Sequence, residues 1–159
     1  MNSKSETYTG KCYCGACAVS ATGKPMIMAY CHCHSCRKWH SAPVNAWCLW
    51  PESDVAFAGP TLQSDKSDES HRVSCGKCGG ALANIKPAQD VVAIYAMSFA
   101  ETDLCFEPAL HIFYGERVLN MADGLPKWDT VPAAWGGHGI ELPEPAGTGW
   151  TSRYPQVDR

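Results

Sequence analysis

The most constraining feature of the sequence is the stretch at residues 30–38, which reads YCHCHSCRK. It places Cys31, Cys33 and Cys36 within six residues and follows them with two cations. A disulfide between thiols this close is strained, because a bridge needs Cα atoms about 4.4–6.8 Å apart and converging side chains. Thiolates on a tight loop instead suit a soft divalent metal such as zinc. Three protein ligands with one open position are typical of a catalytic zinc, whereas a structural zinc takes four.

Composition narrows the class of protein. The 159 residues, with 45% hydrophobic content, predict one domain with its own core. The net charge is −3, and the sequence has no block of basic residues that could contact a phosphate backbone. We therefore expect no nucleic-acid partner. No run approaches the roughly 20 apolar residues that span a bilayer, and residues 1–10 are too polar for a signal peptide. We therefore expect a cytoplasmic protein without a membrane partner, whose ten cysteines serve metal binding or catalysis rather than disulfides.

Two further cysteine pairs predict a second metal site. The stretch GKCYCGAC supplies Cys12 and Cys14, and the stretch SCGKCGGAL supplies Cys75 and Cys78 with a glycine after each thiol. Such paired thiols followed by glycine are typical of zinc knuckles. Together the two pairs predict a closed four-thiolate site that ties the N-terminal part of the chain to its middle.

The spacing of the thiols leaves an alternative grouping open. Cys12, Cys14 and Cys17 repeat the CxCxxC spacing of residues 31–36, so two equivalent three-thiolate sites are conceivable. That grouping would leave the CxxC pair without a metal. The alternating pattern CAVSAT places Cys17 on the buried side of a strand, which favours a core role for this thiol.

The remaining patterns predict an all-β protein. Short apolar or alternating segments recur between Gly and Pro turns, with hardly any helix. We expect one helical turn at residues 37–41, ended by Pro43, and a charged loop at residues 63–70. The expected strands are residues 17–22, 26–30, 44–50, 54–57, 61–62, 91–97 and 111–114.

Four motifs, in this order, resemble the glutathione-dependent formaldehyde-activating enzyme family, which includes the centromere-protein-V relatives. They are GKCYCGA, CHCHSCRK, SCGKCGGAL, and LHIF with ADGLPKW. The resemblance covers residues 10–135, which we expect to form one zinc-binding domain between a flexible arm at residues 1–9 and an extended tail at residues 136–159. It implies a β-tent fold of small antiparallel sheets. It also implies a carbon–sulfur lyase activity, the formation of S-hydroxymethylglutathione from formaldehyde and glutathione.

The resemblance assigns two zincs per chain, one structural with four thiolates and one catalytic with three. Their ligands are Cys12, Cys14, Cys75 and Cys78 for the first, and Cys31, Cys33 and Cys36 for the second. After CRK the chain departs from the family pattern, because Trp39, His40 and Ser41 stand where the family usually has a small residue, Thr and Gly. In the family, the glycine allows a ligand to approach the backbone. Its absence here affects the expected glutathione site most.

Cations and histidines around the three-thiolate loop have candidate roles. Arg37 and Lys38 either attract the carboxylates of a thiol such as glutathione or are solvated surface cations. His32 and His34 are interpreted as side chains that support the ligands or face solvent. His111 is interpreted as a core strand residue near the site.

The role of His40 separates an open site from a closed one. If a helical turn begins at Cys36, His40 lies at i+4 on the same face. It would then either complete a closed set of three thiolates and one imidazole, or line the pocket beside an open zinc as a proton carrier. The family resemblance favours the open site.

Three functions are compatible with these residues. The first is an enzyme of thiol and aldehyde chemistry, in which a three-thiolate zinc lowers the pKa of a substrate thiol or polarises a carbonyl. The second is a two-zinc structural module that binds a partner protein, and the third is a thiol-based metal or redox sensor. The sequence favours the enzyme.

Overall fold

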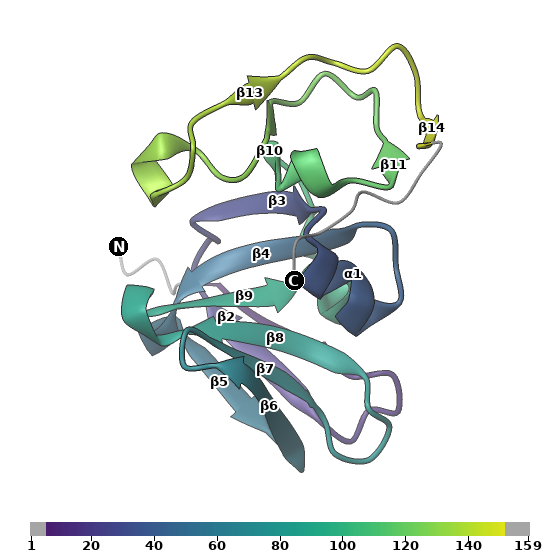
Figure 1. Ribbon diagram of the computed structural model, residues 1–159. Coiled ribbons are helices and arrows are strands. Elements are labelled where there is room, and N and C mark those ends of the chain that lie inside the picture. The colour runs from purple at the N-terminus through teal and green to yellow at the C-terminus, as the bar shows by residue number, and fades with distance from the viewer. Residues whose placement is uncertain (1–5, 152–159) are drawn as a thin grey trace. The chain divides into compact units, whose positions relative to one another are not determined.

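The computed structural model describes residues 6–151, and within them the chain is mostly β-structure, as expected (Figure 1). The one α-helix in this part of the chain, α1, is His34–His40. No helix among the described residues is long and apolar enough to cross a membrane. The strands are β1 (Thr7–Lys11), β2 (Ala18–Thr22), β3 (Ile27–Cys31), β4 (Asn45–Pro51), β5 (Val55–Ala58), β6 (Thr61–Ser67), β7 (Ser70–Cys75), β8 (Ala81–Lys86), β9 (Val91–Tyr95), β10 (Leu110–Ile112), β11 (Leu119–Asn120), β12 (Lys127–Trp128), β13 (Glu141–Leu142) and β14 (Gly149–Trp150).

The described chain divides into two compact units, each made of two separate stretches. The first unit contains residues 6–27 and 47–106, and the second contains residues 28–46 and 107–151. We expected one domain at residues 10–135. That range includes parts of both units.

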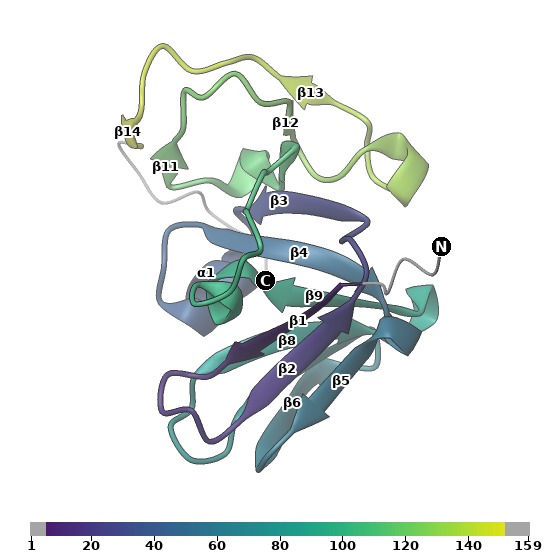
Figure 2. The ribbon, with the colours of Figure 1, turned by 180° about the vertical axis from the view of Figure 1, so that it is seen from behind.

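The first unit is formed by two antiparallel arrays of strands. Strands β1, β2 and β5 form one sheet, and the other runs in the order β4, β9, β8, β7 and β6. The three-stranded sheet lies behind the β6–β9 strands in Figure 1 and in front of them in Figure 2. Apolar side chains that point inward from both arrays are fully buried, which gives this unit its core. They include Val19, Ala21, Leu82 and Ile94.

Aromatic side chains close one end of this core. The rings of Trp50 and Phe99 lie 5.6 Å apart, and those of Tyr8 and Phe99 lie 6.5 Å apart, edge to face. Trp50 also donates its indole N–H to the carbonyl of Gly23 at 3.0 Å. The large apolar area of Trp50 is therefore buried without leaving its one donor unpaired.

Two expectations for the first unit were wrong. The charged loop predicted at residues 63–70 is a β-hairpin, because β6 and β7 pair antiparallel from Thr61 and Cys75 to Ser67 and Ser70. Strand β6 is an edge strand, and charged side chains are usual there, so a polar sequence did not exclude a strand. Strand β1 begins at Thr7, inside the arm expected at residues 1–9.

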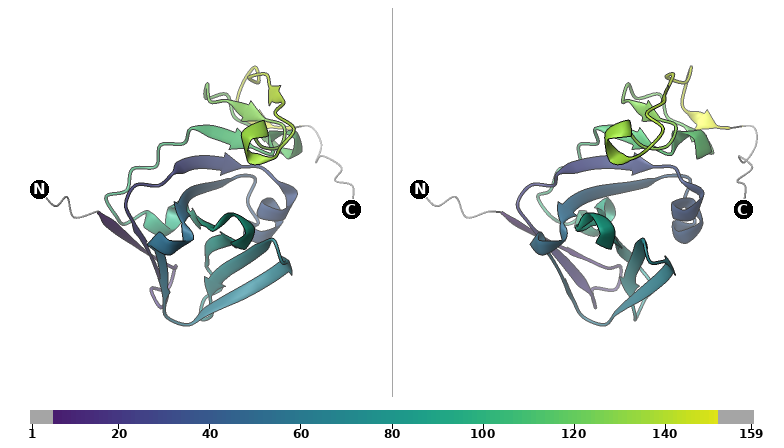
Figure 3. Two further views of the ribbon diagram at one scale, coloured as in Figure 1. Left: turned by 90° about the vertical axis from the view of Figure 1, so that its left-hand side faces the viewer. Right: turned by 60° about the vertical axis from the view of Figure 1, so that its left-hand side comes forward.

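The second unit contains the CHCHSCRK loop. Strand β3 pairs in parallel with β10, β10 pairs in parallel with β12, and β12 pairs antiparallel with β13 (Figure 3). A separate ribbon joins β11 to β14. The parallel pairs occur beside the antiparallel sheets that we expected, and they were not predicted because parallel partners lie far apart in sequence and leave no hairpin signal. Strands β13 and β14 also tie down part of the segment at 136–159, which we expected as an extended tail.

Helix α1 begins and ends with unusual caps. The sulfur of Cys33 accepts from the backbone N–H of Cys36 at 3.3 Å, where a Ser or Asp side chain is more usual. The helix ends at Ser41, which has a left-handed backbone with φ of 50° and donates its N–H to the carbonyl of Arg37. The helix is longer than the turn predicted at residues 37–41, and it stops before Pro43 as expected.

Candidate functional site

Two hairpin turns of the first unit bring four cysteines together. Cys12 and Cys14 lie in the turn between β1 and β2, while Cys75 ends β7 and Cys78 lies in the turn before β8. Each turn contains a glycine with a left-handed backbone, at φ of 75° for Gly15 and 74° for Gly79. This conformation strains other residues, so the glycines allow each turn to fold both of its thiols towards one point.

The four sulfur atoms have the spacing of a metal site. All lie within 4.8 Å of one another. The Sγ atoms of Cys12 and Cys14 are 3.7 Å apart, and those of Cys14 and Cys75 are 3.9 Å apart. A zinc with bonds of about 2.3 Å to a tetrahedron of sulfurs would separate them by about 3.8 Å. The donor set therefore fits a four-thiolate zinc.

Backbone donors surround two sulfurs of this cluster and favour a thiolate at Cys75, whereas the pKa of Cys14 is raised to about 11. The amide of Lys77 donates to the sulfur of Cys75 at 3.3 Å, and the amide of Gly80 donates to that of Cys78 at 3.4 Å. The backbone N–H of Cys78 is the main reason that the pKa of Cys75 falls to about 6. Since only the thiolate form binds metal, these hydrogen bonds prepare the site for a cation.

Cys17 lies next to this cluster but is not part of it. Its amide donates to the sulfur of Cys12 at 3.3 Å, and its side chain is 1% exposed. Burial raises the pKa of Cys17 to about 11, which keeps the thiol neutral. The alternative grouping of Cys17 with Cys12 and Cys14 is thus not the arrangement in the structure.

The second cluster is built on one loop of the second unit. Cys31 ends β3, Cys33 caps α1 and Cys36 lies in its first turn, and their sulfurs lie within 4.8 Å of one another. No histidine nitrogen of the described residues belongs to this group. The neighbouring Cys33 thiol, followed by Cys36 and burial, raises the pKa of Cys31 well above its usual value. Three crowded thiols thus lack a counter-charge of their own, which a bound divalent cation would supply.

Helix α1 presents two different faces. At about 100° per residue, Cys33, Cys36 and His40 share one face, and His34, Arg37, Lys38 and Ser41 share another. The second face lines a cavity of about 390 Å³. Residues that line it include His34, Arg37, Lys38, Ser41, Val118 and Trp150. His40, which we expected in a pocket beside the metal, does not line this cavity.

Contacts with the loop fix the start of α1. The carboxylate of Glu116 accepts from the amide of His34 at 2.6 Å, and the Nε of Arg37 donates to the carbonyl of His32 at 2.9 Å. The amide of His32 donates in turn to the carbonyl of Ile112 in β10 at 3.0 Å. Arg37 is half-buried, whereas His34 and Lys38 are exposed. Arg37 is therefore more than a solvated surface cation, because it also braces the metal loop.

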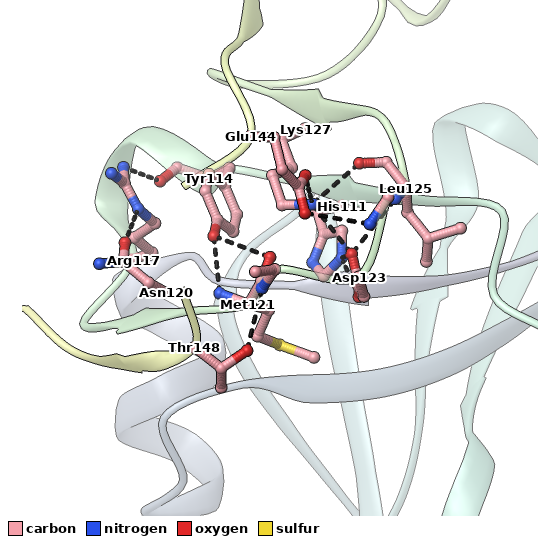
Figure 4. Close-up of polar contacts among 12 residues, drawn as sticks. His111, Tyr114, Arg117, Asn120, Met121, Asp123, Leu125, Lys127, Glu144 and Thr148 are labelled. Atoms are coloured by element: carbon pink, nitrogen blue, oxygen red, sulfur yellow. Dashed lines mark hydrogen bonds and ion pairs between the residues drawn. The ribbon is translucent and has the colours of Figure 1, made fainter. Parts of the chain in front are cut away.

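A buried chain of polar contacts within the second unit begins at the loop that carries the second cysteine cluster. His32 and His111 are both fully buried, with Nε2 of the first 2.9 Å from Nδ1 of the second. His111 Nε2 lies 2.9 Å from the carboxylate of Asp123 (Figure 4). Asp123 accepts from Lys127 at 2.9 Å, and Lys127 also donates to Glu144 at 2.6 Å. Lys127 is 1% exposed, so its charge is buried with two carboxylates as partners.

The carboxylate of Asp123 determines which nitrogens of the two imidazoles carry protons. Desolvation lowers the pKa of His32 to about 3 and is also the largest cause of the lowered pKa of His111, so both rings are neutral. Asp123 can only accept, because hydrogen bonds from Lys127 and His111 lower its pKa although burial opposes this. His111 therefore donates from Nε2 and accepts at Nδ1, and His32 donates to it. Nδ1 of His32, buried without a hydrogen-bond partner among the described residues, carries a bare lone pair.

Sequence reasoning missed most of this chain. His111 was expected in the core and is buried, and His32 was expected to support the ligands or to be exposed. Sequence analysis gave no role to Asp123, Lys127 or Glu144. The motif ADGLPKW contains Asp123 and Lys127 at i and i+4, which was the one available signal of an ion pair.

Comparisons with known proteins agree with this site. A sequence model described as glutathione-dependent formaldehyde-activating enzyme matches residues 7–116. A protein of Schizosaccharomyces pombe named as an uncharacterized lyase is 29% identical over 75 residues, which is 47% of this chain and 55% of that protein. The match thus spans about half the length of that relative.

A crystal structure of a Rhodobacter sphaeroides protein shares the fold. Its TM-score is 0.50 at 13% sequence identity, and the match covers 60% of this chain and 90% of that one. The likeness shows the architecture alone. The family match, in contrast, includes both cysteine clusters and well over half of the chain. The chain therefore belongs to the glutathione-dependent formaldehyde-activating enzyme family.

Proposed function

We propose that this protein is a cytoplasmic zinc-dependent carbon–sulfur lyase that joins a glutathione-like thiol to a small aldehyde such as formaldehyde, and that catalyses the reverse cleavage. In the forward direction the thiol sulfur forms a bond to the aldehyde carbon. The carbonyl π bond breaks, and the proton of the thiol ends on the new hydroxyl oxygen. The product with glutathione and formaldehyde is S-hydroxymethylglutathione.

The observation that carries the proposal is the difference between the two cysteine clusters. Cys12, Cys14, Cys75 and Cys78 offer four sulfurs, which complete a tetrahedral site. The cluster at residues 31–36 offers three, with no histidine nitrogen of the described residues beside them. A zinc held by these three thiolates would keep a position for a ligand, and it would supply the means to lower the pKa of a thiol or to polarise a carbonyl.

Other residues have proposed roles around the open site. His40 shares the face of α1 with Cys33 and Cys36, so it is placed to carry the proton from the thiol to the new hydroxyl. Arg37 and Lys38 attract the carboxylates of a thiol such as glutathione, and Arg37 is already held by the carbonyl of His32. The buried chain from His32 to Asp123 holds the loop that carries the ligands.

The test combines metal content with exchange kinetics. The purified protein should contain two zincs per chain, one of them released faster to a chelating dye. It should also accelerate the exchange of ¹³C-formaldehyde with glutathione, measured by NMR, above the spontaneous rate. Cys36→Ser should lose one zinc and this acceleration. The matched control is Cys105→Ser, because Cys105 is exposed and outside both clusters.

Three outcomes would overturn the proposal. One is two equally inert zincs with no acceleration for glutathione or simpler thiols, which would favour the structural module. A second is a Cys36→Ser protein that accelerates the exchange of formaldehyde with glutathione as fully as the wild type does. Reversible oxidation of the thiols with loss of metal, and no exchange activity, would likewise overturn it in favour of a redox sensor.

A further inference from the structure

The cavity beside α1 has an apolar part that the proposed roles of Arg37 and Lys38 do not use. It lies on the face of the helix that carries Arg37 and Lys38, whereas Cys33 and Cys36 lie on another face. We propose that this cavity binds a carboxylate joined to an apolar body, and that Trp150 forms its apolar wall. The lining contains none of the clustered thiols, and the inference rests on the proposed function only in that Arg37 and Lys38 are also proposed to attract the carboxylates of the thiol.

The charge of the lining favours an anion. His34, Arg37 and Lys38 line the cavity, and no acidic residue is among its lining residues in the described part of the chain. The nearest acid along the sequence is Glu116, whose carboxylate is engaged by the amide of His34 at 2.6 Å. Arg37 is held through its Nε by the carbonyl of His32, so its guanidinium is oriented before a ligand arrives. A pre-oriented guanidinium with a lysine beside it is suited to a carboxylate.

The apolar part of the lining comes from the residues that follow α1, from Val118 and from strand β14. Ala42, Pro43 and Val118 contribute small apolar surfaces, and Val118 is 4% exposed. Trp150 completes this side, although its own side chain is 68% exposed. A volume of about 390 Å³ is within the usual range for sites that hold small molecules. The lining therefore combines a cationic side with an apolar one.

The backbone of Trp150 is fixed, which distinguishes it from a solvated surface tryptophan. Strand β14 pairs with β11 through Leu119 and Trp150. The amide of Thr151 donates to the carbonyl of Val118 at 2.9 Å, directly after the tryptophan. The exposed indole is thus held at the cavity by strand pairing on both sides. A ligand with an apolar body would cover this ring, which water otherwise contacts.

Two apolar residues of the cavity lining, Val118 and Trp150, lie outside the part of the chain that the family model matches. Val118 and Trp150 follow residue 116, where the match ends, whereas His34, Arg37 and Lys38 lie within it. The choice of apolar body would accordingly be a property of this chain rather than of the matched region. Substitutions at Trp150 should change which carboxylates bind without touching the metal ligands.

Calorimetric titration of the zinc-loaded protein with phenylacetate tests the proposal, with phenylacetamide as the neutral analogue. Phenylacetate should bind with a Kd of about 1 mM, as expected for about ten heavy atoms, and phenylacetamide about tenfold more weakly. Lys38→Met and Trp150→Ala should each weaken phenylacetate binding by about five- to tenfold. Lys24→Met and Trp135→Ala are matched controls, because both residues are exposed and outside the cavity lining, and they should bind as the wild type does.

Competition with S-methylglutathione identifies the source of the carboxylate. This compound keeps the carboxylates of glutathione, but its sulfur has no proton to lose and so it does not react with the aldehyde. Displacement of phenylacetate by S-methylglutathione would show that the cavity holds the carboxylate arm of the thiol substrate. Binding of both together would show a site for a separate carboxylate. Equal affinities for phenylacetate and phenylacetamide would overturn the proposal, as would wild-type binding by Trp150→Ala and Lys38→Met. The exchange of formaldehyde with glutathione by the unsubstituted protein is measured separately, so failure of the cavity and failure of the enzyme are distinguishable.

Discussion

The imidazole of His32, between two metal-ligand candidates, lies 2.9 Å from the imidazole of His111 although 79 residues separate them in sequence. The two rings connect the loop after β3 to strand β10, which also pairs with β3 in parallel. Tyr114 packs edge-on against both rings, at 4.8 Å from His32 and 5.4 Å from His111. The position of the candidate catalytic loop therefore depends on a buried contact as well as on strand pairing.

Removal of His111 should destabilise the protein. In His111→Ala, the imidazole of His32 loses its hydrogen bond and a cavity replaces the ring of His111, which should cost about 2–4 kcal/mol of the free energy of unfolding. Urea unfolding measures this change. His138→Ala is the control, because His138 is 65% exposed in its side chain and should cost less than about 0.5 kcal/mol. A His111→Ala protein as stable as this control would contradict the role given to the chain.

The same histidine should make stability depend on pH. Its pKa in the folded protein is lowered, mainly by burial, so the unfolded chain takes up a proton first as the pH falls below about 6.5. Stability is then lost as the pH falls, with a slope of up to about 1.4 kcal/mol per pH unit from this group. His111→Gln removes the titrating group, so the stability difference from wild type should shrink between pH 8 and about pH 5.5. Paired urea titrations measure the difference in the free energy of unfolding between the two proteins, and acid release of zinc affects both alike. A difference that stays constant with pH would show that His111 does not titrate as described.

Ser41→Gly should stabilise the protein. Ser41 has a φ of 50° at the C-cap of α1, a conformation that costs a side chain about 1 kcal/mol and costs glycine little. It occupies the place where the family pattern usually has glycine. We expect a gain of about 0.5–1 kcal/mol, or about 2–3 °C in Tm, after the larger entropy of glycine in the unfolded chain is included. Ser41→Ala, which keeps the strain, should show no gain; a lower Tm for Ser41→Gly than for wild type would contradict the explanation.

The two cysteine clusters should differ in their importance for folding. Zinc binding contributes on the order of 10 kcal/mol in small zinc modules, and Cys75 joins two hairpin turns of the first unit, so Cys75→Ala should be insoluble or molten. Cys36→Ala should stay folded and lose one zinc, because its cluster lies on one loop. Circular dichroism melts with metal analysis distinguish these results. A folded Cys75→Ala protein with both metals, or equal destabilisation in the two variants, would show that the assignment of structural and catalytic sites is wrong.

His40→Ala should separate an open site from a closed one. His40 shares a helix face with Cys33 and Cys36, but its nitrogens are not grouped with their sulfurs. The variant should therefore keep two zincs per chain and lose most thiol-dependent exchange, by about 10²-fold or more if it carries the proton. Loss of one zinc equivalent would show that His40 is a fourth ligand.

The spacing of cysteines predicted both clusters because metal ligation depends mainly on residues close in sequence. Cys31, Cys33 and Cys36 come from one loop, and each half of the other cluster comes from one turn with its glycine. Alternation along CAVSAT similarly predicted the burial of Cys17, since side chains on a strand alternate between faces. Local geometry was sufficient in each case.

Tertiary structure alone decided the surroundings of the second cluster. The contact of His32 with His111, the burial of Lys127 beside Glu144 and the position of Trp150 at the cavity all join residues far apart in the chain. Parallel pairing of β3 with β10 brings the first of these together, and no turn signal marks such a pair. The burial of Lys127 also requires Glu144, 17 residues away, and the local pattern indicates only its nearer partner, Asp123.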